Sequence, residues 1–124
     1  MCLRSKSDEY LVADEDIPCY KVLVEYGVNK YSTPTIGALV PDDVLAGTRL
    51  MVASGDEDIH LDFGCYSVGG GFIHSYAKLT LAMTYSLGYR AIFNCVIPKG
   101  ERYFVSSDGT QYASKSIRFV KKVG

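Results

Sequence analysis

The sequence predicts an α+β fold built mostly of antiparallel β-sheet with one main helix. Three observations favour this class. Runs rich in β-branched and aromatic residues recur along the chain, separated by Gly, Pro and Asp-Gly turn signals. One longer stretch, residues 76–87, has the length and flanking signals of a helix. The 124 residues, 48% of them hydrophobic, suffice for one domain with its own core.

Net charge and the cysteine pattern exclude several classes of partner and site. Thirteen basic and 14 acidic residues give a formal charge of −1, which provides no general attraction to nucleic acid or anionic lipid. No stretch approaches the roughly 20 consecutive apolar residues of a membrane-spanning helix. The four cysteines form no CxxC pair, so we expect no zinc site and no other metal site.

The N-terminal segment, residues 1–16, is dense in charge and has no apolar periodicity. We expect a flexible arm outside the core, followed by a single α+β domain over residues 17–124. The segment lacks the apolar run and cleavage site of a secretory signal, so a cytoplasmic location with reduced cysteines is expected. Within the domain, Cys19 and Cys95 are expected to be buried as small apolar residues.

The domain begins with one clear strand. Residues 19–26 follow a proline, are rich in β-branched and aromatic side chains, and end at Gly27. Pro34 then predicts a loop.

Residues 37–68 allow more than one interpretation. A helical turn with Asp42 or Asp43 as its N-cap fits residues 42–46, and a strand fits residues 48–53. The acidic residues 54–58 lack the ligand spacing of a calcium loop and predict a solvated turn.

Three glycines at residues 69–71 lead into a short strand and then into the main helix, residues 76–87. Ser75 is its candidate N-cap, and Gly88 is its stop signal. The glycines lack the GxGxxG spacing of a nucleotide-binding loop, so they favour a flexible or positive-φ connection over a phosphate site.

The C-terminal third reads as strands joined by turns. Residues 90–97 form a strongly apolar run that ends in a Pro-Lys-Gly turn, which indicates a central strand. Residues 102–106 predict its return strand, a Ser-Asp-Gly turn follows, and residues 116–120 predict the last strand.

No catalytic constellation emerges from the residues themselves. His74 and Ser75 are adjacent, so on a strand they point to opposite faces and cannot act as a base and nucleophile pair. His60 lies near Asp58 and Asp62 in sequence, but two histidines and scattered carboxylates are a weak basis for a metal site.

Three segments carry a resemblance to known proteins. They are Cys19-Tyr20-Lys21-Val22-Leu23, Gly71-Phe72-Ile73-His74-Ser75-Tyr76, and Cys95-Val96-Ile97-Pro98-Lys99-Gly100-Glu101-Arg102-Tyr103 followed by Tyr112-Ala113-Ser114-Lys115. Together they resemble small uncharacterised proteins of gut Bacteroidales and their phages. The resemblance covers most of the chain but carries no assigned activity.

More distantly, the order of a first strand with an aromatic residue, a Phe-x-x-Ser strand, a helix and a strand ending in Ile-Pro-x-Gly is similar to the ADP-ribosyltransferase fold. That resemblance implies that Tyr20 or Lys21 contacts NAD. It also implies that His74, Ser75 and Tyr76 replace the Ser-Thr-Ser segment of those enzymes.

The catalytic glutamate of that family lies on the strand before the Pro-x-Gly turn. Residues 92–97 hold no carboxylate, and Asn94 offers a neutral amide there. Glu101 lies beyond the turn, where we expect a solvated residue near Lys99 or Arg102.

The leading prediction is therefore a small soluble accessory or binding protein, without catalytic residues or cofactor, whose partner is a small molecule or another protein. The alternative is an ADP-ribosyltransferase-like or degenerate NAD- or nucleotide-binding protein, for which NAD is the cofactor. The candidate ligand-binding residues are Tyr20, Lys21, His74, Ser75, Tyr76 and Asn94.

Overall fold

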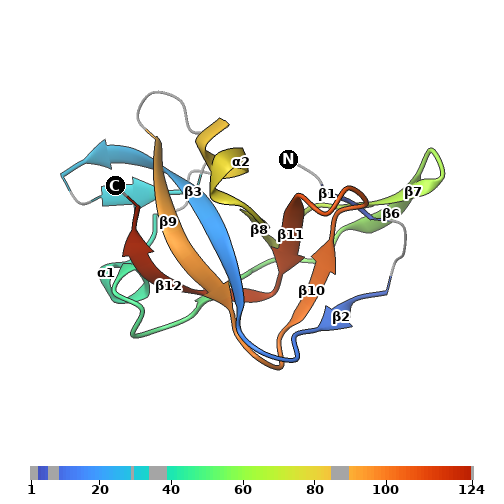
Figure 1. The fold of residues 1–124 in the computed structure, drawn as a ribbon, viewed down its shortest axis with the longest axis horizontal. Coiled ribbons are helices and arrows are strands. Elements are labelled where there is room, and N and C mark those ends of the chain that lie inside the picture. The colour runs from blue at the N-terminus through green and yellow to red at the C-terminus, as the bar shows by residue number, and fades with distance from the viewer. Residues whose placement is uncertain (1–2, 6–8, 29, 34–38, 85–89, 124) are drawn as a thin grey trace.

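Two long strands, β3 (Ile17–Gly27) and β9 (Arg90–Ile97), pair along almost their whole length at the centre of the computed structural model (Figure 1). The structure describes residues 3–5, 9–28, 30–33, 39–84 and 90–123. Their antiparallel register runs from Ile17 opposite Ile97 to Val24 opposite Arg90. The apolar, β-branched composition of both segments explains why they form the buried centre of a sheet.

The remaining elements are short. Around the central pair lie β1 (Leu3–Ser5), β2 (Leu11–Val12), β4 (Lys30–Ser32), α1 (Asp42–Leu45), β5 (Met51–Val52), β6 (Ile59–Asp62), β7 (Cys65–Val68), β8 (Ile73–Tyr76), α2 (Leu79–Thr84), β10 (Arg102–Val105), β11 (Gln111–Ser114) and β12 (Ser116–Lys122). The strand predictions near residues 19–26, 90–97, 102–106 and 116–120 are confirmed.

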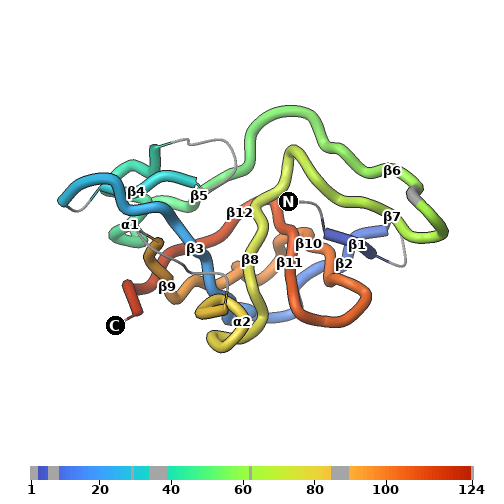
Figure 2. Tube along the Cα trace, turned by 90° about the horizontal axis from the view of Figure 1, so that it is seen from above, coloured from blue at the N-terminus to red at the C-terminus, as the bar shows by residue number. Residues whose placement is uncertain are grey.

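The strands form two antiparallel sheets. The larger has the order β2-β10-β11-β8-β3-β9-β12-β5, with β4 paired to β3, and the smaller has the order β1-β7-β6. Figure 2 shows the small sheet at one end of the molecule and α1, β4 and β5 at the other. The prediction of a mostly antiparallel sheet fold is confirmed, although the described residues contain two short helices in place of one main helix.

Most of the apolar core lies on one face of the β3–β9 pair. Cys19 and Leu23 of β3 pack there with Phe93 and Cys95 of β9, together with Phe119 of β12. Cys19 and Cys95 are directly opposite each other and are almost fully buried, as predicted. A second cluster joins the two sheets, and a third lies beneath α2.

The N-terminal segment differs from the expected arm outside the core. Leu3 is 1% exposed and packs with Phe104 and Ala113 of the large sheet, while Ala13 is 2% exposed in the main core. Strands β1 and β2 pair with β7 and β10. The expected placement outside the core is therefore wrong for Leu3 and Ala13, which are buried although the segment is dense in charge, whereas Leu11 and Val12 are each 53% exposed.

The predicted helix is shorter and starts later. Tyr76 is the last residue of β8, and the Ala77 amide still donates to the Thr110 carbonyl. Ser75 lies inside β8 and is not an N-cap, so that prediction is wrong. Because β8 pairs with β11 as far as Tyr76, the residues expected to form the first helical turn belong to the strand or follow it, and α2 begins at Leu79. The predicted stop at Gly88 lies outside the described residues.

The turn after β9 does not return the chain along β9. Strand β10 pairs instead with β11 and β2. The turn bonds to the N-terminal segment, since the Gly100 amide donates to the Ala13 carbonyl and the Ala13 amide donates to Glu101. The predicted hairpin of β9 with β10 is thus wrong. The Asp-Gly turn is present, but it joins β10 to β11, a strand that is not predicted from the sequence.

Between residues 39 and 68 the structure resolves the alternatives. The helical turn α1 is present, but its N-cap is Pro41 rather than Asp42 or Asp43. Of the proposed strand over residues 48–53, only β5 pairs in the sheet. The β6–β7 hairpin follows the acidic turn and projects from the end of the molecule that holds the small sheet (Figure 1). No helix among the described residues is long and apolar enough to cross a membrane.

Candidate functional site

The six candidate residues lie on three neighbouring strands. β8, β3 and β9 are adjacent in the large sheet. Tyr20 is the register partner of both Tyr76 on β8 and Asn94 on β9, so these three form one row across the sheet. The fold thus brings together the three segments that hold the candidate residues.

The sheet nevertheless separates the candidates between its two faces. Directly opposite residues share a face, and neighbours along a strand alternate. Tyr20, Tyr76 and Asn94 therefore share one face, while Lys21 and Ser75 belong to the other. Helix α2 covers the first face, where its residue Ala82 packs with Val22 and Ile92, and the rings of Tyr20 and Tyr76 pack against this cluster.

His74 and Ser75 are held apart, as their adjacency on a strand predicts. The His74 Nε2 lies 3.0 Å from the Gly69 carbonyl oxygen, and its buried Nδ1 has no hydrogen-bond partner among the described residues. Burial lowers the pKa of His74, and the nearby charge of Lys21 acts in the same direction. The Ser75 hydroxyl is also buried.

Lys21 is the most unusual candidate because it is a charged residue in the middle of a core strand. It is 9% exposed, and its ammonium donates a hydrogen bond to the His74 carbonyl at 2.8 Å. Burial lowers the pKa of Lys21 from 10.5 to about 8, and nearby Cys95 and Cys19 offset part of that effect. Burial also raises the pKa of Cys19 to about 11 and raises that of Cys95.

A cavity of about 620 Å³ lies beside Lys21. Both Lys21 and His74 contribute to its lining. The other walls come from Thr33, residues 39–41, Val44, residues 49–56 and residues 69–73. Most of these side chains are apolar, as is typical of small-molecule sites.

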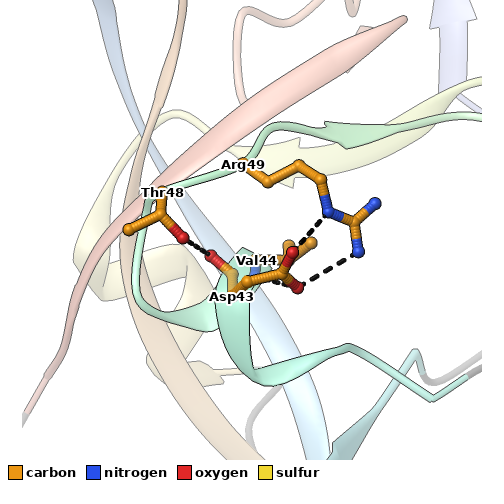
Figure 3. A network of polar contacts seen from close by, with 4 residues as sticks. All are labelled: Asp43, Val44, Thr48 and Arg49. Atoms are coloured by element: carbon orange, nitrogen blue, oxygen red, sulfur yellow. Dashed lines mark hydrogen bonds and ion pairs between the residues drawn. The ribbon is translucent and has the colours of Figure 1, made fainter.

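One wall of this cavity is braced by a polar network around α1 (Figure 3). Arg49 donates two hydrogen bonds to the Asp43 carboxylate, at 2.6 and 3.1 Å. The same carboxylate accepts from the Val44 amide, and the Thr48 hydroxyl donates to the Asp43 carbonyl. The Arg49 guanidinium holds the pKa of Asp43 below its ordinary value. Because Val44 and Arg49 both line the cavity, the network positions that wall.

The glycine segment, residues 69–71, also lines the cavity. Gly71 has φ of 79°, and a Cβ on it would lie 2.7 Å from the Asp56 carbonyl oxygen. Only glycine combines that backbone conformation with so close an approach. The predicted positive-φ connection is therefore confirmed. Lys115 fixes the segment from outside, donating to the Gly71 carbonyl at 2.7 Å while pairing with Glu57 at 3.3 Å.

The other candidate chemistry is more dispersed. His60 pairs with Asp58 at 3.0 Å on the surface, and no group of three or more potential metal ligands occurs in the described part of the chain. Glu101 accepts hydrogen bonds from the Arg102 amide and from the Ser116 hydroxyl. It thus joins β10 to the start of β12 and lies outside the lining of the cavity.

The sequence predicts Lys21 and His74 as ligand-binding residues, but it predicts the glycine segment only as a connection and does not indicate the walls from residues 39–56. Lys21 was the one sequence feature that could have indicated these walls, because it is the only charged residue in residues 17–24. A charged side chain in a buried strand needs a cavity or a polar partner close to it. Comparison with protein-family models, curated proteins and solved structures yields no match, so the site must be interpreted from its own geometry.

Proposed function

We propose that this protein binds a small molecule in the cavity beside Lys21 and acts by binding rather than by catalysis. The observation that carries the proposal is a lysine 9% exposed at the wall of a cavity of about 620 Å³. That volume falls within the range of roughly 300–1,000 Å³ typical of ligand pockets. A buried ammonium is costly, so its presence at a cavity favours a role in recognition over a role in stability.

The arrangement of nucleophilic groups supports binding without catalysis. Ser75 lies on the face opposite His74, and burial keeps the thiols of Cys19 and Cys95 protonated at neutral pH. Cys19 and Cys95 are free although they face each other across two strands. Free thiols in this arrangement suit a reducing compartment, so a cytoplasmic location is part of the proposal.

Fluorescence of N-phenyl-1-naphthylamine, an uncharged apolar probe, tests the proposed function. We expect saturable binding of one probe molecule per chain, with NMR shifts concentrated at the amides of Val40, Met51 and Ile73. Val44→Phe narrows the cavity and should weaken binding at least fivefold, while Val120→Phe, on an exposed position outside the lining, serves as the matched control.

The NMR shifts are measured on the unmodified protein, so they locate the bound probe even if Val44→Phe fails to fold. Saturable binding that shifts the cavity amides supports the proposal. Absence of binding, or shifts spread over other surfaces, contradicts it.

The second candidate is the NAD- or nucleotide-binding protein that the resemblance to ADP-ribosyltransferases implies. Its support is the register that aligns Tyr76, Tyr20 and Asn94 on adjacent strands. Since α2 packs over this row, a nucleotide there requires the helix to move. Titration with NAD distinguishes the two candidates. Shifts at Tyr20 and Asn94 favour the nucleotide site, and an unchanged spectrum favours the cavity alone.

A further inference from the structure

Of the two cationic side chains at the cavity wall, Arg49 has a carboxylate partner and Lys21 has none among the described residues. Two cationic residues line it, Lys21 and Arg49. Arg49 is neutralised by its two hydrogen bonds to Asp43. Lys21 forms no ion pair with any carboxylate among the described residues, including Asp56, which also belongs to the lining. Among the described residues of the lining, the Lys21 ammonium is thus a buried charge without an anionic partner.

The groups packed around the Lys21 ammonium are uncharged at neutral pH. On β8, the His74 carbonyl accepts one hydrogen bond, and burial lowers the pKa of the His74 imidazole. On β3 and β9, burial raises the pKa of the thiols of Cys19 and Cys95. An ammonium has three N–H donors, of which the His74 carbonyl takes one. Donors remain for a ligand, together with a full positive charge.

The apolar side chains that line the rest of the cavity favour a ligand with a hydrocarbon portion. Val40 and Val44 are buried in the main core, and Met51 and Ile73 pack with them. The exposed Leu39 and Val52 extend the apolar lining outward. A hydrocarbon chain or ring in contact with these side chains gains roughly 25 cal/mol per Å² of apolar surface removed from water.

We propose that the cavity binds an amphipathic carboxylate, whose head group pairs with the Lys21 ammonium and whose hydrocarbon body lies against the apolar walls. This inference rests on the proposed function and specifies its ligand class. A singly charged carboxylate matches the single uncompensated ammonium, whereas a phosphate dianion would leave a buried negative charge without a partner.

Octanoate and 1-octanol test the inference because they share a hydrocarbon chain and differ in the charged head group. Displacement of N-phenyl-1-naphthylamine at pH 7 gives both affinities. We expect octanoate to bind at least tenfold more tightly than 1-octanol. Lys21→Met should remove that preference while changing the 1-octanol affinity less than twofold. Lys122→Met, an exposed lysine outside the lining, should leave both affinities unchanged.

A pH series on the unmodified protein keeps the inference falsifiable if Lys21→Met fails to fold. Octanoate affinity should fall as pH rises from 7 to 9.5, because Lys21 loses its proton there, while 1-octanol affinity stays constant. Equal affinity for the two compounds at every pH overturns the carboxylate inference and leaves the binding function intact. Failure of the apolar probe itself to bind contradicts the proposed function.

Discussion

Lys21 interrupts a strand that is otherwise suited to the core. Its neighbours on the same face of β3 are Cys19 and Leu23, both buried. A methionine would fill similar space without an ammonium that must lose its hydration. The stability cost of Lys21 is therefore open to direct measurement.

Lys21→Met should raise the free energy of unfolding at pH 7 by about 1–2 kcal/mol, the gain from removing a buried charge less the lost hydrogen bond to His74. Urea denaturation followed by circular dichroism measures it. A variant less stable than the parent at pH 7 would mean that the ammonium has a stabilising partner.

The same comparison has a defined pH dependence. The pKa of Lys21 is lowered from 10.5 to about 8 in the folded protein, so between these values the unfolded chain binds more protons. The loss of folding stability caused by the buried Lys21 charge is complete below pH 8, and it decreases as pH rises toward 10.5. The stability gap between the variant and the parent should shrink from pH 7 to pH 9.5. Both proteins contain Cys19 and Cys95, whose titration largely cancels in the difference.

At the scale of elements, the glycine segment and the loop after β5 depend on each other. Gly71 approaches Asp56 and Glu57 so closely that any side chain would displace the backbone. Gly70 has space, since the nearest atom to an added Cβ is 3.7 Å away. Two adjacent glycines therefore differ sharply in what they tolerate.

Gly71→Ala should reduce the free energy of unfolding by more than about 2 kcal/mol, from the positive φ and the clash combined. Gly70→Ala is the matched control and should change it by less than about 1 kcal/mol. Thermal and urea unfolding measure both variants. Equal effects of the two substitutions would contradict the wall geometry.

Local sequence patterns predicted the strands β3 and β9 and the Asp-Gly turn after β10. Apolar strand runs and tight turns are determined by the chemistry of neighbouring residues, so they can be predicted from a short stretch of sequence. The helix prediction failed at Ser75 because pairing with β11 decides whether that segment is a strand. The turn after β9 bonds to Ala13, far away in sequence, and local patterns contain no information about that contact.

At the scale of the whole molecule, a shared core connects the two sheets. Leu3 and Val68 of the small sheet pack with Phe104 and Ala113 of the large one. Composition suggested an arm before residue 17, because the segment is dense in charge and has no apolar periodicity. A few buried side chains nevertheless place that segment in the fold. The candidate site was likewise half predictable, since Lys21 and His74 were identified but the cavity needs residues 39–56 from a different part of the chain.

Leu3→Ala should therefore reduce the free energy of unfolding by about 2–4 kcal/mol, the usual cost of a cavity in a core. Leu11→Ala, at a position 53% exposed, should cost much less. Urea unfolding of the two variants checks the difference. If both variants match the parent, the N-terminal segment does not contribute to the core.

The pKa of Lys21 shows whether this residue is a buried ammonium that pairs with a carboxylate ligand. An NMR pH titration of the lysine ε-methylene signals measures it, with the Lys21 signal assigned by its loss in Lys21→Met. The account predicts one lysine with a pKa of about 8 in the free protein, and a rise in that pKa when octanoate binds and favours the charged form. A Lys21 pKa near 10.5 in the free protein, unchanged by octanoate, would contradict it.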